Sequence, residues 1–64
     1  MTIKIGQEYK LDNGIAITIG NLIKDTVHFW TYYSNGRRII NKMAISEFEF
    51  YLLSNGAKLV EIVS

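Results

Sequence analysis

Thr26-Val-His-Phe-Trp-Thr-Tyr-Tyr-Ser-Asn-Gly-Arg-Arg-Ile-Ile-Asn-Lys-Met-Ala-Ile45 is the stretch that decides the fold. Its first half is rich in β-branched and aromatic residues, which favour strands. Asn35-Gly36 then supplies two residues that tolerate positive φ, as a tight primed turn requires. Apolar residues interspersed with cations follow this turn. The pattern therefore predicts a β-hairpin with its turn at Asn35-Gly36.

The predicted hairpin has two different faces, because successive side chains of a strand point to opposite sides. Val27 and Phe29 are purely apolar, so we expect their side of the first strand to face the core. The other side forms a partly exposed ridge of His28, Trp30 and Tyr32. On the returning strand, the better core candidates are Ile39, Asn41, Met43 and Ile45.

The segment before the hairpin extends it into an antiparallel sheet. Asp12-Asn-Gly14 reads as a turn between two strands. Residues 15–20 alternate between isoleucine and a small residue, which is typical of a strand with one buried face. Gly20-Asn21 favours a bend or a bulge, and Lys24-Asp25 a hairpin tip. Residues 2–5 are expected to form an edge strand or a loosely docked arm.

One short helix is predicted before the last strand. Ser46 and Glu49 have the spacing of a capping box, and Ile45 and Phe50 that of a hydrophobic staple. Asn55-Gly56 supplies a left-handed stop, so we expect a helix of roughly two turns. Its apolar stripe consists of Phe48, Tyr51 and Leu52.

The order of these elements favours a mainly β fold with one short helix before the last strand, which spans residues 57–63. It resembles the SH3-like small antiparallel barrel of about five strands, whose closure protects the sheet edges. An open four- or five-stranded sheet packed on one helix is the alternative. With 64 residues, we expect residues 1–64 to form a single domain with a small core.

The composition of the chain limits which binding sites, reactions and cellular locations we expect. The chain has no Cys, and His28 is its only His, so we expect no metal site and no cofactor. No arrangement of residues predicts catalysis, and we expect a protein that is not an enzyme. No apolar run approaches the roughly 20 residues that span a bilayer. Met1-Thr-Ile-Lys also lacks the apolar core of a signal peptide, so the expected location is cytoplasmic.

The candidate site is the ridge together with the cations beside it. Aromatic residues and arginine are enriched in protein interfaces, but they also stack on bases and contact phosphates. The net charge is only +1, which favours a protein partner over a nucleic acid. A purely structural role, in which Trp30 covers a barrel end or packs under the helix, stays open. The candidate binding residues are His28, Trp30, Tyr32, Arg37, Arg38 and Lys42.

Four motifs give the chain a resemblance to a known group. They are Gly6-Gln-Glu-Tyr9, Asp12-Asn-Gly14, Val27-His-Phe29 and Ser46-Glu-Phe-Glu-Phe50. With these motifs, the chain resembles short phage and prophage proteins of the SH3-like type. The resemblance implies a small accessory or inhibitory protein that acts by binding, in the host cytoplasm, and it supplies no catalytic residues.

The leading hypothesis is therefore a small non-enzymatic protein-binding module, a phage-encoded inhibitor or modulator of a larger host protein complex. The alternative is a small barrel that binds RNA or DNA through the same ridge. A homodimer is a third hypothesis, because an exposed aromatic ridge is easily self-complementary.

Overall fold

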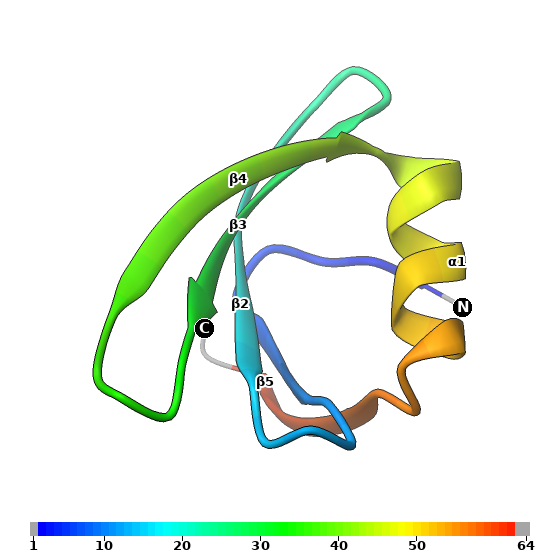
Figure 1. Cartoon of the computed structure of the whole chain (residues 1–64). Coiled ribbons are helices and arrows are strands. Elements are labelled where there is room, and N and C mark those ends of the chain that lie inside the picture. Colours follow the sequence, from blue (N-terminus) through cyan, green and yellow to red (C-terminus); the bar gives the residue numbers. More distant parts are fainter. Residues whose placement is uncertain (1, 63–64) are drawn as a thin grey trace.

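The computed structural model describes residues 2–62 and contains one antiparallel sheet and one helix. The strands have the spatial order β4-β3-β2-β1-β5. The sheet curls around α1, which lies on its concave side (Figure 1). A mainly β fold with one helix before the last strand is thus confirmed. The elements are β1 (Gln7–Lys10), β2 (Ala16–Ile23), β3 (Thr26–Tyr32), β4 (Arg38–Ala44), α1 (Ile45–Ser54) and β5 (Lys58–Ile62).

The sheet is open. β4 and β5 are its two edge strands, and no pairing between them joins the sheet into a barrel within residues 2–62. Closure of the predicted barrel is therefore not confirmed. The alternative drawn from the sequence, an open five-stranded sheet packed on one helix, describes the arrangement.

The core fills the space between the concave face of the sheet and α1. Val27 and Phe29 are buried, so the predicted inward side of β3 is confirmed. Phe48 and Leu52 of α1 are 0% exposed, and the ring centres of Phe29 and Phe48 lie 4.7 Å apart. The buried apolar residues are Tyr9, Leu11, Ile17, Ile19, Val27, Phe29, Phe48 and Leu52.

The residues of the predicted inward set that lie on β4 pair with the buried residues of β3 and face inward as predicted, but none of them is fully buried. Met43 and Ile45 are half-buried and pack against the core, and Ile39 is also half-buried. Asn41 is exposed, and its Nδ2 donates to the hydroxyl of Thr31 at 3.1 Å. β4 is an edge strand, so its inner side is covered less completely than that of β3.

The central turn is longer than the predicted primed turn. The Gly36 N–H donates to the Tyr33 carbonyl at 3.0 Å, and the Tyr33 N–H to the Arg37 carbonyl at 2.8 Å. Gly36 has φ +87°, but Asn35 does not take a positive φ. The Asn35 side chain instead accepts the Arg37 N–H at 2.9 Å. Asparagine thus holds this loop by its side-chain oxygen, and only the glycine adopts the left-handed conformation.

The loop between β1 and β2 repeats this geometry. The Leu11 N–H donates to the Ile15 carbonyl at 2.8 Å, and the Gly14 N–H to the Leu11 carbonyl at 3.0 Å. The Asn13 side chain accepts the Ile15 N–H at 3.0 Å. The predicted turn at residues 12–14 is confirmed, and the Asn-Gly sequences of these two hairpins form the same kind of loop.

The predictions of a capping box and a hydrophobic staple are wrong, because neither motif forms at the start of α1. α1 begins at Ile45 with Ala44 at the N-cap, and no side chain caps it. The Ile45 N–H donates instead to the Asp25 carbonyl at 2.8 Å. Because β4 runs directly into α1, Ser46 lies inside the first turn and not before it. Phe50, expected in the staple, is 72% exposed.

The predicted left-handed stop of the helix is confirmed. The Ala57 N–H donates to the Leu52 carbonyl at 3.0 Å, and the Gly56 N–H to the Leu53 carbonyl at 3.3 Å. These two bonds form a Schellman motif around Gly56, whose φ is +63°. A Cβ at Gly56 would also collide with the carboxylate of Asp12. α1 has 10 residues, so it is longer than the expected two turns.

Residues 2–5 form a docked arm and not an edge strand. Gln7 is buried and holds the arm: its Oε1 accepts the Lys4 N–H at 2.8 Å, and its Nε2 donates to the Thr2 carbonyl at 3.1 Å. The Tyr9 hydroxyl donates to the same Oε1 at 3.1 Å. Val63, placed in the predicted last strand, lies outside the described residues.

The connection between β2 and β3 also follows the prediction. The pairing register shifts between Ile19 and Asn21, which is the expected bulge at Gly20. Lys24 forms the hairpin tip with φ +54° and is the only non-glycine residue with positive φ within residues 2–62.

Candidate functional site

The outer, convex face of β3 and β4 gathers most of the predicted site. His28 lies opposite Lys42, Trp30 opposite Ile40, and Tyr32 opposite Arg38 in the pairing register. Directly opposite residues project to the same face of a sheet, so these side chains form a continuous surface. Arg37 lies in the loop before β4 and is exposed. The structure therefore brings five of the predicted residues onto one face, with Arg37 at its margin.

Trp30 is half-buried on this face and has contacts on its own sheet. The Arg38 guanidinium carbon lies 5.2 Å from the centre of the Trp30 ring. The backbone of β2 approaches the indole where Gly20 has no side chain, since a Cβ there would lie 3.7 Å from Trp30 Cδ1. Arg38 and Gly20 thus hold the indole against the sheet. The expectation that Trp30 could pack under the helix is wrong, because α1 covers the opposite face.

Ile40 is the most exposed large apolar side chain on β3 and β4, at 58%. It lies between Arg38 and Lys42 on the outward side of β4. Ile40 is not among the binding residues predicted from the sequence. The available signal was an isoleucine between two outward-facing cations. We refer to Trp30, Tyr32, Arg38 and Ile40 as the outer patch.

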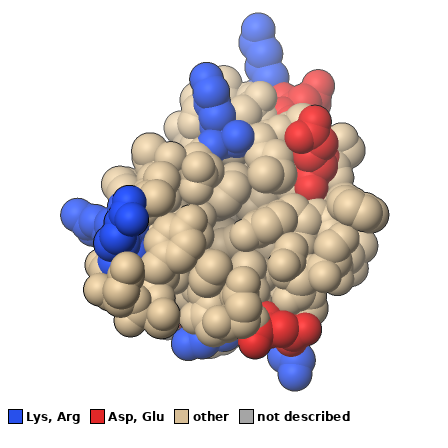
Figure 2. Space-filling model, in the orientation of Figure 1, with Lys and Arg blue, Asp and Glu red and all other residues tan. Residues whose placement is uncertain are grey.

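A second apolar surface lies between β4 and α1. A shallow groove of about 460 Å³ runs there, and its apolar wall consists of Met43, Phe50 and Tyr51. Figure 2 shows that the middle of this view is uncharged, with cations at its left and upper margins, acidic residues at its upper right, and both kinds of charge at its lower margin. Burial, with a smaller contribution from Tyr33, raises the pKa of Tyr51 above its ordinary value of 10.0. No short sequence pattern predicts this groove, because it depends on how β4 curls past α1.

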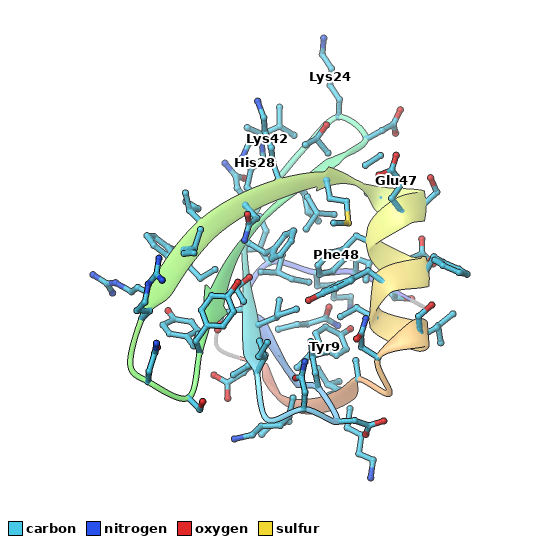
Figure 3. All side chains as sticks on the ribbon, in the orientation of Figure 1. Tyr9, Lys24, His28, Lys42, Glu47 and Phe48 are labelled. Carbon is cyan, nitrogen blue, oxygen red and sulfur yellow. The ribbon has the colours of Figure 1, made fainter. Side chains whose placement is uncertain are left out.

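A hollow with several charged lining residues lies at the end of the ridge, beside the tip of the β2–β3 hairpin. Its volume is about 560 Å³, and Lys24, His28, Lys42 and Glu47 are among its lining residues. Figure 3 shows these side chains at the same end of the molecule, above the core residue Phe48. Sequence reasoning identified His28 and Lys42 but missed Lys24, which the hairpin tip brings beside them.

Within residues 2–62, no group of three or more His, Cys, Asp or Glu side chains is placed to hold a metal ion. The exposed side chains of the outer patch are aromatic, aliphatic or cationic, which suits binding. In the same part of the chain, no helix is long and apolar enough to cross a membrane.

No protein family, curated protein or solved structure matches this chain. The relationship with short phage proteins stays a prediction. The function is therefore inferred from the surface itself.

Proposed function

We propose that this protein is a small binding module without catalytic activity, and that it engages a larger protein through the outer patch. The observation that supports this most directly is the 58% exposure of Ile40 beside Trp30 and Arg38. Burial of a fully exposed isoleucine side chain contributes about 1.5–3 kcal/mol. An aliphatic centre flanked by tryptophan, tyrosine and arginine is the composition of a binding hot spot.

A protein partner fits this patch better than a nucleic acid. Single-stranded nucleic acids bind where aromatic rings are free to stack on bases. Trp30 already has the Arg38 guanidinium over its ring, so this ring is less available to a base. The net charge of +1 is also small for a protein that must neutralise several phosphates.

On the resemblance to short phage proteins, we further propose that binding inhibits or modulates a host protein complex. In this proposal the module acts by occupying, through the outer patch, a surface that another protein uses.

Affinity capture from a bacterial lysate tests the proposed function. The bait is the wild type, Ile40→Ser or Val60→Ser, each with and without nuclease. Val60 is 57% exposed on the opposite edge strand, so it is a matched control for loss of an exposed apolar side chain. We expect a protein that survives nuclease, remains on Val60→Ser and is lost from Ile40→Ser. Partners that disappear with nuclease would instead support nucleic-acid binding.

A further inference from the structure

β4 presents an unpaired backbone edge. It is the terminal strand on its side of the sheet. At the two ends of its pairing with β3, the Tyr33 N–H donates to the Arg37 carbonyl and the Ile45 N–H to the Asp25 carbonyl. Hydrogen-bonded pairs alternate along an antiparallel ladder, so the odd-numbered residues of β4 bond to β3. The backbone groups of Arg38, Ile40 and Lys42 therefore point away from the sheet.

Two different surfaces flank this edge. On the outer face, Arg38 and Lys42 lie on either side of Ile40, and β4 itself carries no acidic residue. On the inner side, the groove beside α1 offers Met43, Phe50 and Tyr51. Phe50 is 72% exposed there, which leaves a large apolar side chain without cover. An added strand would therefore place its alternate side chains against a cationic face and an apolar groove.

We propose that an extended segment of the partner adds to the sheet beside β4 as a further strand, with acidic side chains on the outer face and apolar side chains in the groove. This inference rests on the proposed function, and it specifies which side chains the partner segment carries on each face. Strand addition derives affinity from main-chain hydrogen bonds and specificity from alternate side chains. Acidic residues four positions apart on such a strand would face Arg38 and Lys42, and the residue midway between them would lie opposite Ile40.

A second copy of this chain fits the edge less well. Antiparallel self-pairing of β4 centred on Asn41 would place each Ile40 opposite a lysine and bring the two Lys42 side chains to diagonal positions on one face. Like charges at such positions disfavour pairing, and edge lysines generally prevent it. The charge of β4 therefore favours an acidic strand from another protein.

Selection from a random twelve-residue peptide library displayed on phage, with the folded wild-type protein as bait, tests the proposal. We expect enriched peptides that alternate acidic and apolar residues. Replacement of the acidic residues by lysine in a synthetic copy should weaken binding at least tenfold. Failure to enrich any peptide, or enrichment without acidic residues, would overturn the proposal.

Ile40→Pro and Ile40→Ala form a matched pair for the backbone contact. Both remove the isoleucine side chain, but only proline removes the outward N–H, a position at which edge strands tolerate proline. We expect Ile40→Pro to bind the selected peptide at least tenfold more weakly than Ile40→Ala. Equal binding by these two variants would overturn strand addition while leaving the outer patch as the binding surface. Binding that neither variant weakens would contradict the proposed function as well.

Amide hydrogen exchange gives a readout that does not depend on the proline variant folding. In the wild type, the amides of Ile40 and Lys42 should become protected when the selected peptide is added, because they donate to the new strand. Absence of protection at both amides under saturating peptide would overturn the proposal. Sedimentation of the free protein as a dimer that the peptide does not dissociate would do so too.

Discussion

The two faces of the sheet are built from the same strands but differ in burial. On β3, Val27, Phe29 and Thr31 point inward and are buried, whereas His28 and Trp30, on the other side, are only half-buried. The 10-residue helix covers the concave face at β3, whereas the inner side of β4 stays partly open. The convex face has no such cover within residues 2–62 and retains an exposed isoleucine among aromatic and cationic side chains. The inner face therefore maintains the fold, and the outer face is available for binding.

The strongest test of this comparison is truncation on the inner face. Phe48 is 0% exposed and packs against Phe29 with the two rings tilted by 46°, so Phe48→Ala should remove about 3–5 kcal/mol of stability. A domain of this size has a free energy of unfolding on the order of a few kcal/mol. We expect the variant to be largely unfolded by circular dichroism at room temperature. A urea midpoint equal to that of the wild type would show that α1 does not hold the core.

A smaller but still clear loss is expected at the end of α1. Gly56→Ala must adopt φ +63° and also place its Cβ against the Asp12 carboxylate. Gly14 has φ +89° with no atom near its missing Cβ, so Gly14→Ala isolates the backbone strain of roughly 1–2 kcal/mol. In urea unfolding, Gly56→Ala should be the less stable of the two. Equal midpoints would mean that Asp12 moves aside at little cost.

Alkaline pH should also weaken the inner face. Burial raises the pKa of Tyr9 above its ordinary value of 10.0, so the folded state favours the neutral phenol. The contribution of Tyr9 is fully present below pH 10 and is lost as the pH rises through the folded pKa. Urea unfolding from pH 8 to 11 should show stability falling at the upper end. Tyr9→Phe should flatten that fall, and an unchanged slope would assign it to other groups.

On the outer face, truncation should leave stability almost unchanged. Ile40→Ser removes a side chain that is mostly in solvent, and such surface changes usually fall within about 0.5 kcal/mol. Thermal unfolding of Ile40→Ser and Val60→Ser should therefore resemble that of the wild type. A loss as large as that of Phe48→Ala would mean that Ile40 belongs to the core and that the two faces do not divide as described.

The smallest effect is expected at Gly20. A Cβ at this position would lie at ordinary contact distance from the Trp30 indole, and Gly20 has no positive φ. Gly20→Ala should therefore be tolerated, with a change in stability of under about 1 kcal/mol, and should shift the tryptophan fluorescence. A large destabilisation would show that the bulge needs glycine for its backbone.

Local patterns predicted much of this fold. The alternation of residues 15–20 and the apolar pair Val27 and Phe29 correctly identified the buried side of each strand, because period-two patterning depends only on neighbouring residues. The end of the helix at Gly56 was predicted correctly because it depends only on neighbouring residues. The start of α1 was not predicted correctly, because the carbonyl that accepts its first N–H belongs to Asp25, 20 positions earlier in the chain.

The candidate site was predicted in part for the same reason. His28, Trp30, Tyr32, Arg38 and Lys42 follow from strand alternation once the hairpin register is known. The exposure of Ile40 depends on β4 being an edge strand, and closure of the sheet depends on how far β4 and β5 curl. Both are properties of the whole sheet that no short segment of the sequence specifies.

The most direct test of the account is the amount of nuclease-resistant partner that Ile40→Ser retains relative to Val60→Ser. Both variants lose an exposed apolar side chain from an edge strand and should be equally stable. If the outer patch binds the partner, Ile40→Ser should retain less than about a tenth of the partner, because a hot-spot truncation costs ~2 kcal/mol. Equal retention by two folded variants would contradict the claim that the convex face of β3 and β4 is the functional surface.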